Sequence, residues 1–311
     1  MLIAVSTVHL TNSATESSES DHSELMSSSL SESASAKALL AWWSEHGRDG
    51  IPWKLTVQAD LPLPDQELDP YGIWIAEVML QQTRLAVVLP YWRRWMAAFP
   101  TVQSLAAASL DEVRLQWQGL GYYSRARRLH EAAQRLVSGP WPRDLDSWMD
   151  LPGIGRTTAG SILSSAFNTP FPILDGNVKR VLARLQAHPR PPARDQAQFW
   201  QWSEALLDPL RPRDYNQALM DLGATVCTPR NPNCGICPWR SCCAAYASGD
   251  PSRWPMTDAS KPLPFQVIGV GIVFNTAGNV LIDQRMEEGL LGGMWEFPGG
   301  KVEPGEKPET T

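Results

Sequence analysis

The chain is 311 residues long and carries a formal net charge of −6, and this length allows two folded domains. Its charge is uneven: residues 1–35 hold five acidic and no basic side chains, residues 263–311 hold seven acidic and three basic ones, and the stretch between them has a net charge of +3. This middle stretch could bind a polyanion, although its field is modest. The chain has no run of about 18 apolar residues and no secretion signal, so we expect a cytoplasmic protein without membrane spans.

Residues 1–35 are rich in Ser and Glu and poor in large apolar side chains, a composition that predicts a disordered tail. Residues 36–50 then follow an amphipathic helical pattern that ends near Gly47. The proline- and acid-rich stretch from Trp53 to Tyr71 predicts a surface loop.

Residues 71–89 place apolar side chains at helical spacing and predict one helix. Glu77 lies inside this apolar run. Either its side chain reaches solvent from the helix edge, or it is a partly buried carboxyl whose raised pKa makes it a good proton donor.

Residues 92–99, 110–117 and 124–137 show further helical patterns with no strand between them, so this part is predicted to be all-α. The segment 119–128 combines glycines and two tyrosines with three arginines. Such a segment fits contacts with bases and phosphates. A solvated helix face with buried tyrosines is the other interpretation.

A tight turn between two helices is predicted within residues 151–162. Gly153 and Gly155 permit a positive φ and close backbone approach, and free N–H groups at the start of the second helix can hold a phosphate. An ordinary helix connection is the alternative. Asp175 precedes a third predicted helix, either as its N-cap or as a catalytic carboxylate.

All five cysteines lie between residues 227 and 243, a density that favours a metal site over a disulfide framework. Thiolates in this arrangement suit either Zn²⁺ or a [4Fe–4S] cluster, and the spacing excludes neither. After a proline-rich linker at 251–264, residues 267–274 and 279–285 predict two strands joined by a turn at 275–278. A second, β-containing domain is therefore expected over residues 265–311.

Together these segments resemble the MutY adenine DNA glycosylases of the helix-hairpin-helix, endonuclease III-like superfamily. The resemblance covers residues 36–250, where the Glu77 segment, residues 119–127, the hairpin, the Asp175 segment and the cysteine spacing occur in the family's order. It implies a mainly α fold, with a helix-hairpin-helix glycosylase domain and a [4Fe–4S] cluster loop at 227–243. It also implies a monomer that binds double-stranded DNA with A:8-oxoG or A:G mispairs and hydrolyses the glycosidic bond of the mispaired adenine.

The resemblance implies a role for individual residues. Glu77 would protonate the extruded adenine, Asp175 would stabilise the cationic sugar, and Asn177 would hold Asp175 or the attacking water. Tyr122 would be the wedge beside the opposite base. The implied cluster ligands are Cys227, Cys234, Cys237 and Cys243, with Cys242 a bystander. The implied DNA contacts are Gln81, Gln82, Tyr122, Arg125, Gly153, Gly155 and Thr157.

Thr157 occupies the position where bifunctional relatives such as endonuclease III have a lysine nucleophile. Without an amine at this position, strand cleavage by β-elimination lacks its dedicated nucleophile. We therefore expect a monofunctional, hydrolytic glycosylase.

Residues 265–311 resemble the beginning of a Nudix fold, which MutY proteins use to recognise 8-oxoguanine. Gly300 and Glu306 match the opening of the Nudix box, but its remaining ligands would lie beyond Thr311. We therefore expect an incomplete α+β Nudix-like domain without Nudix hydrolysis. The chain is then either a fragment of a longer product or impaired in reading 8-oxoguanine.

Two other functions fit parts of the pattern. A thymine-mismatch or uracil glycosylase of the same superfamily would not need the Glu77 segment to protonate its leaving group. A non-catalytic DNA-binding or redox module would use only the hairpin and the cluster.

Overall fold

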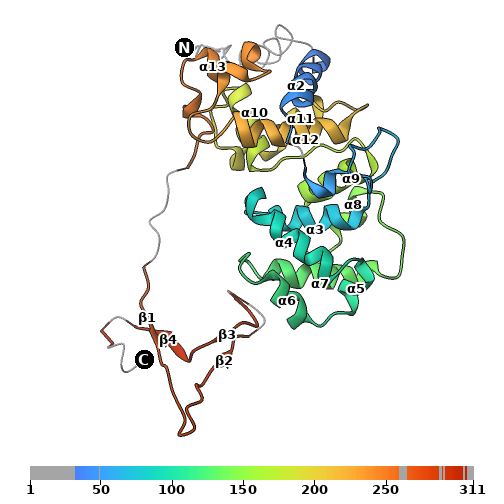
Figure 1. Ribbon diagram of the computed structural model, residues 1–311. Helices are drawn as coiled ribbons and strands as arrows, with labels where there is room; N and C mark the ends of the chain where they lie inside the picture. The colour runs from blue at the N-terminus through green and yellow to red at the C-terminus, as the bar shows by residue number, and fades with distance from the viewer. Residues whose placement is uncertain are drawn as a thin grey trace, which may run out of the picture.

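The computed structural model describes residues 32–48, 50–258, 265–286, 289, 291–303 and 305–306. It consists of a helical part in two lobes followed by short strands (Figure 1). Of the tail expected to be disordered over residues 1–35, residues 1–31 lie outside the described residues, whereas residues 32–35 are helical and Ser35 is buried, so the prediction is wrong for these four. Helix α2 spans Glu32–His46, so it ends where predicted but begins before residue 36. Among the helices described, none is long and apolar enough to span a membrane.

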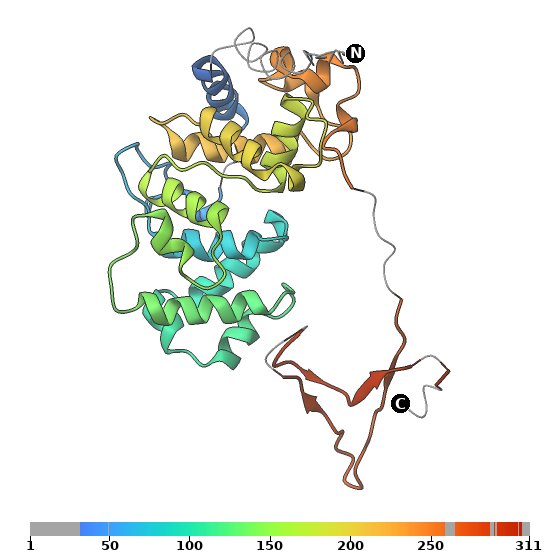
Figure 2. The ribbon, with the colours of Figure 1, turned by 180° about the vertical axis from the view of Figure 1, so that it is seen from behind.

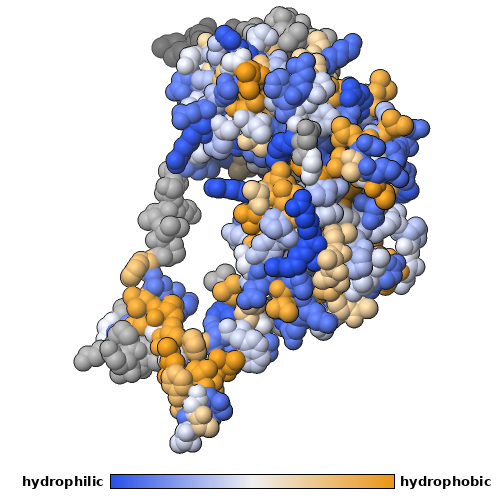
Figure 3. Space-filling view, in the orientation of Figure 1, coloured by the Kyte–Doolittle hydropathy of each residue, from blue (hydrophilic) through white to orange (hydrophobic). Residues whose placement is uncertain are grey.

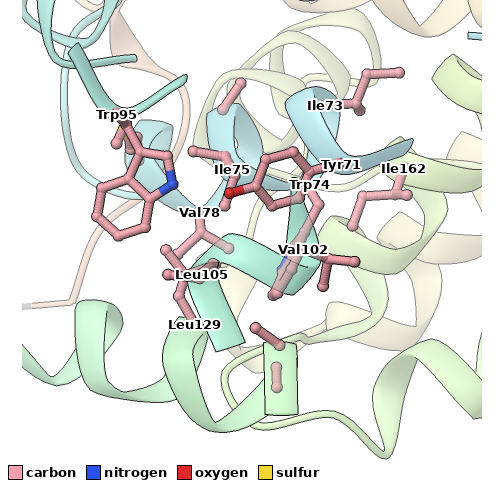
Figure 4. Packing of buried hydrophobic residues seen from close by; sticks show 14 of the residues in the cluster. Tyr71, Ile73, Trp74, Ile75, Val78, Trp95, Val102, Leu105, Leu129 and Ile162 are labelled. Carbon is pink, nitrogen blue, oxygen red and sulfur yellow. The ribbon is translucent and has the colours of Figure 1, made fainter. Parts of the chain in front are cut away.

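The first lobe surrounds one hydrophobic core that runs from Ile51 to Ala166. Every residue of its central helix α3 is buried except Glu77 and Leu80. Figure 4 shows side chains of α3, including Tyr71 and Trp74, packed among others from α4, α5, α7 and α9. The elements of this lobe are η1 (Pro52–Lys54), α3 (Pro70–Leu80), α4 (Leu85–Ala98), α5 (Val102–Ala107), α6 (Leu110–Trp117), α7 (Ser124–Leu136), α8 (Leu145–Met149) and α9 (Arg156–Phe167).

The single helix predicted over residues 71–89 is wrong, because the chain forms α3 and α4 with a break at residues 81–84. Gln82 adopts φ +60°, which a right-handed helix cannot contain. The buried guanidinium of Arg125 binds carbonyl groups in the last turn of α3, so these groups need no further helical turn. The pattern at residues 92–99 belongs to the second half of α4.

The second lobe has a separate core, built from α2 and the chain after residue 172. Helix α2 packs against α12, so segments far apart in sequence share this core, as Figure 2 shows from behind. Its further elements are α10 (Gly176–Leu185), η2 (Pro192–Arg194), α11 (Gln196–Ala205), α12 (Pro212–Asp221), the π-helical segment η3 (Leu222–Val226), η4 (Cys234–Ile236), η5 (Arg240–Cys242), α13 (Ala244–Ala247) and η6 (Pro251–Arg253).

Arg213 of α12 forms hydrogen bonds that connect the two lobes. Its buried side chain donates to the carbonyls of Ser165 (2.7 Å) and Ala166 (3.2 Å) at the end of α9. It also donates to the carbonyls of Leu63 (3.2 Å) and Gln66 (2.8 Å) in the predicted surface loop. A buried cation needs such hydrogen-bond acceptors. These hydrogen bonds hold the loop against the helices, although Val57 within the loop is exposed.

The first residues of the expected linker pack against the second lobe. Trp254 is buried, its carbonyl accepts a hydrogen bond from Arg184 (3.0 Å), and Asp258 forms an ion pair with Arg194. The helical part therefore extends to residue 258 and does not end at residue 250. Residues 259–264 lie outside the described residues.

The C-terminal strands form two antiparallel pairs, β1 with β4 and β2 with β3. The predicted turn is confirmed, since Gly278 has φ +81° and the Asn275 side chain accepts N–H groups from Ala277 and Asn279. The strands are shorter than predicted, and apolar side chains between β1 and β2, such as Ile272 and Phe274, are exposed. Figure 3 shows hydrophobic surface gathered on this C-terminal segment. The strands are β1 (Ile268–Val270), β2 (Asp283–Gln284), β3 (Trp295–Glu296) and β4 (Gly299–Lys301).

Candidate active site at the junction of the lobes

Glu77 is the acidic residue that the apolar helix α3 carries near its end, and it remains only partly accessible. Burial raises the pKa of its carboxyl to about 7; the negative charge of Asp175 raises it further, while the neighbouring Ser161 hydroxyl and Lys54 ammonium lower it. Such a carboxyl is partly protonated at neutral pH, whereas an exposed glutamate is ionised. The structure thus favours the interpretation of Glu77 as a proton donor.

Asp175 comes from the second lobe and is the N-cap of α10. Its carboxylate accepts the backbone N–H of Val178 (2.7 Å) and a longer hydrogen bond from the Asn177 amide (3.4 Å). Burial raises the pKa of Asp175, while these N–H donors oppose the rise. The negative charge of Asp175 acts on Glu77, so the two carboxyls lie within electrostatic range of each other where the lobes join.

A chain of hydrogen bonds connects Asp175 to the cysteine loop. The Asn177 side chain accepts a hydrogen bond from Arg180 (2.8 Å). The same guanidinium donates to the carbonyls of Gly223 (2.6 Å) and Cys227 (2.8 Å). The orientation of the capping carboxylate therefore depends on the backbone around η3 and on the start of the cysteine loop.

Sequence reasoning missed Lys54, Ser161 and Asp221. The Lys54 ammonium lies 3.7 Å from the carboxylate of Asp221, which is fully buried and also bound by Arg48 at 2.6 Å. Burial lowers the pKa of Lys54 to about 8. A cavity of about 520 Å³ opens beside Lys54 and Arg48. These residues lie in different segments with no motif around them, so only the fold could bring them to Glu77.

The predicted hairpin is confirmed between α8 and α9. Gly153 has φ +83°, and a Cβ there would lie 3.1 Å from the side chain of Arg128, so glycine is required. Gly155 is the N-cap of α9 with φ −99° and open space around it, so it does not use the conformational freedom expected of it. Helix α9 has no side-chain cap, which leaves N–H groups of its first turn available to an anion. Thr157 lies in this turn and is half-buried.

The residues predicted to contact DNA separate into two groups. Gln82 and Tyr122 are exposed, Tyr122 to 62%. Gln81 and Arg125 instead form hydrogen bonds within the protein, and their expected contacts with DNA stay a prediction. The Gln81 amide donates to the Thr158 hydroxyl (3.3 Å), and Arg125 is only 6% exposed because its guanidinium is surrounded by backbone carbonyls.

The thiols of the predicted cluster set influence one another. Burial, followed by the charges of the other three, raises the pKa of Cys237 to about 12, and the pKa values of Cys234 and Cys243 shift in the same direction. Cys242 has no such contribution from other cysteines; its thiol donates to the Trp239 carbonyl. The described residues do not group three or more His, Cys, Asp or Glu side chains as ligands of one metal ion.

Comparison with known proteins shows the family to which the chain belongs. Residues 75–204 match the HhH-GPD superfamily of base excision DNA repair proteins, and residues 269–311 match the NUDIX domain. The adenine DNA glycosylase of Buchnera aphidicola subsp. Acyrthosiphon pisum is 32% identical, over 85% of this chain and 73% of its own length. This chain belongs to the adenine DNA glycosylase family. The human adenine DNA glycosylase is 39% identical over 87% of this chain, and the mouse protein 38% over 86%.

This adenine DNA glycosylase family member spans about three fifths of the human and mouse relatives' length, 58% and 61%. Among solved structures, a thermostable thymine-DNA glycosylase superposes with a TM-score of 0.60 at 25% identity and covers 70% of this chain and 97% of its own. Endonuclease III from a non-covalent DNA complex gives 0.55 at 23% identity, over 71% and 98%. The predicted helix-hairpin-helix glycosylase fold is therefore confirmed.

Proposed function

We propose that this chain is a monofunctional glycosylase that acts as a monomer on double-stranded DNA and hydrolyses the N-glycosidic bond of adenine mispaired with 8-oxoguanine or guanine. The observation that carries the proposal is that Glu77, half-buried on α3, and Asp175, held as the N-cap of α10 by the Val178 N–H (2.7 Å), lie within electrostatic range of each other in different environments. Membership of the adenine DNA glycosylase family supports the choice of base.

Glu77 supplies the proton. Adenine is a poor leaving group as an anion, so protonation of its ring lowers the barrier to bond cleavage. With a pKa of about 7, the Glu77 carboxyl is protonated in a large fraction of molecules at neutral pH and is still acidic enough to give the proton up. A pyrimidine-specific enzyme does not need this group, which favours adenine over thymine or uracil.

Asp175 supplies the negative charge. As the bond breaks, positive charge develops at C1′ and needs a fixed anion nearby. The N–H of Val178 and the amide of Asn177 hold the Asp175 carboxylate in one orientation, so little reorganisation accompanies the reaction. Asn177 is itself held by Arg180.

The nucleotide must leave the base stack to reach these carboxyls. Gln82 and Tyr122 are exposed and suited to fill the vacated space. The hairpin at Gly153–Gly155 and the uncapped first turn of α9 offer backbone N–H groups to a phosphate. Thr157 offers no amine for β-elimination, and Lys54 is ion-paired with Asp221, so water is the nucleophile.

Cys227, Cys234, Cys237 and Cys243 would hold a [4Fe–4S] cluster. The donor set fits in its chemistry, because the charges of the other three cysteines act on the Cys237 thiol, which would ionise readily only when bound iron compensates its charge. When bound, the cluster fixes the loop structurally. Arg180 and Arg184 hydrogen-bond to this loop from α10. The segment matching the NUDIX domain would read the base opposite the adenine.

The deciding experiment is a glycosylase assay under single-turnover conditions. Duplexes carrying A opposite 8-oxoguanine, A opposite G, T opposite G and U opposite G are treated with the purified chain. Base release from the first two only is the expected result. Release from the last two alone would reject the proposal, and a borohydride-trapped adduct formed as fast as base release would reject the monofunctional mechanism.

A further inference from the structure

Arg125 lies in the first turn of α7, between two exposed loops, and is buried. One terminal nitrogen of its guanidinium donates toward the end of α3, and the other donates toward the loop before α7. The acceptors of the first are the carbonyls of Val78 (3.1 Å), Met79 (3.1 Å) and Gln81 (2.6 Å). The acceptors of the second are the carbonyls of Leu120 (3.1 Å) and Gly121 (3.1 Å).

The chain has an unusual backbone conformation directly after one acceptor in each loop. Gln82, which follows the Gln81 carbonyl, has φ +60°, and Tyr122, which follows the Gly121 carbonyl, has φ +49°. Residues with a Cβ rarely adopt this left-handed conformation unless the surroundings hold it. The Arg125 guanidinium binds the carbonyl before each of them, and the Trp117 indole N–H also donates to the Gly121 carbonyl (3.0 Å), so one guanidinium links the two loops.

Both side chains are presented outward. Gln82 is exposed and Tyr122 is 62% exposed, while the Arg125 guanidinium lies 5.6 Å from the Tyr122 ring centroid. Gln82 lies two residues past the end of α3, the helix that carries Glu77. An exposed aromatic ring and an exposed amide in fixed orientation are suited to occupy the space that an extruded nucleotide leaves.

We propose that Arg125 is a positioning residue that holds Gln82 and Tyr122 as one unit for insertion into the duplex, and thereby controls nucleotide extrusion separately from the chemistry at Glu77. This inference rests on the proposed glycosylase function. Lysine could not replace Arg125, because a single ammonium cannot reach both sets of carbonyls, whereas the planar guanidinium spans them.

The test measures extrusion directly. Glu77→Gln protein, which retains the fold but lacks the acid, is bound to a duplex in which 2-aminopurine replaces the target adenine, and unstacking of this base is followed by its fluorescence. Arg125→Met and Arg125→Lys are each added to this background. Both should bind the duplex yet lose most of the fluorescence increase, and Tyr122→Ala should behave in the same way. With Glu77 restored, Arg125 variants should excise adenine about tenfold to a hundredfold more slowly.

Arg211→Met, which removes an exposed arginine paired with Asp214, is the matched control and should change neither readout. A full fluorescence increase in the Arg125 variants would overturn the proposal, whether or not excision is slowed. If Arg125→Lys alone retains the full fluorescence increase, a positive charge is sufficient at this position. That result would overturn the proposal that Arg125 holds both loops. If the Glu77→Gln parent gives no fluorescence increase and the wild type excises no adenine, the glycosylase function itself fails.

Discussion

The two lobes each contribute one carboxyl to the candidate site, and the surroundings of that carboxyl differ between the lobes. In the first lobe, Glu77 lies on a helix whose other residues are nearly all buried, and loss of water raises its pKa to about 7. In the second lobe, Asp175 caps a helix and is held by N–H donors and by the Asn177–Arg180 pair. Burial acts on both, but the Ser161 hydroxyl is the one donor that lowers the pKa of Glu77, whereas two backbone N–H groups and the Asn177 amide favour the charged form of Asp175.

This contrast shows how two similar side chains acquire different tasks. A carboxyl deprived of water and with few donors tends to keep its proton, and a carboxyl surrounded by donors tends to keep its charge. The assignment of acid and anion therefore follows from helix position: Glu77 lies within α3, whereas Asp175 lies at the N-terminus of α10, where free N–H groups are available. Each prediction below alters one side of this contrast.

The largest effect is expected from removing the acid. Glu77→Gln cannot protonate the leaving base and should slow adenine excision by about a hundredfold to ten-thousandfold, measured under single-turnover conditions. Duplex affinity should stay close to that of the wild type, since the amide is similar in size. Excision within a few-fold of the wild type would assign the proton donor to another group.

A smaller loss of excision rate is expected when the Asp175 carboxylate is held less firmly. Arg180→Met removes the hydrogen bond to Asn177 and those to the carbonyls of Gly223 and Cys227. Hydrogen bonds to charged groups contribute about 1.5–3 kcal/mol, so excision should fall by about tenfold to a hundredfold. Arg190→Met, which removes a largely exposed arginine beyond α10, is the control for loss of charge. An unchanged rate in Arg180→Met would show that Asp175 is oriented by its backbone donors alone.

The pH dependence of the excision rate should follow the protonation of Glu77. As the proposed acid, Glu77 would act in its protonated form, so the excision rate should be level below its pKa of about 7 and fall about tenfold per pH unit above it. The ammonium of Lys54 lowers this pKa, so Lys54→Met should move the fall to higher pH. A shift to lower pH in that variant would contradict the assignment of Glu77 as the acid.

Gly223→Ala tests how closely the second lobe packs around the anion. A Cβ at this position would lie 2.7 Å from the Cβ of Asn177. The clash should destabilise the fold by about 1–3 kcal/mol and displace Asn177, which thermal unfolding and the excision rate would show. Gly155→Ala has open space around its Cβ and should leave the unfolding temperature nearly unchanged.

The smallest effect is expected at Cys242. Its thiol lies apart from the charge interactions of the other cysteines, so Cys242→Ser should retain the iron content and the visible absorbance of the wild type. Cys243→Ser should lose both. Equal loss in the two variants would place Cys242 among the ligands.

Much of the site could be predicted because its signals are local. The hairpin glycines, the cysteine spacing, and the acids Glu77 and Asp175 each stand within a short motif. The break after α3 could not be predicted, because it depends on Arg125, which arrives from the next part of the chain and binds carbonyls that a longer helix would have used. Lys54 and Asp221 were missed for a related reason: their ion pair joins segments far apart in sequence.

The packing of α2 against α12 has a consequence for the order of folding. The first lobe, from Ile51 to Ala166, is continuous in sequence and can form its core as soon as that stretch has been synthesised. Helix α2 is made earlier but finds its partners only after residue 172. Its apolar side, with Leu39 and Trp42, therefore stays unpacked in the nascent chain while the first lobe folds. We therefore expect the Asp175 half of the site to be completed after the first lobe, because α2 can pack against α12 only once both have been synthesised.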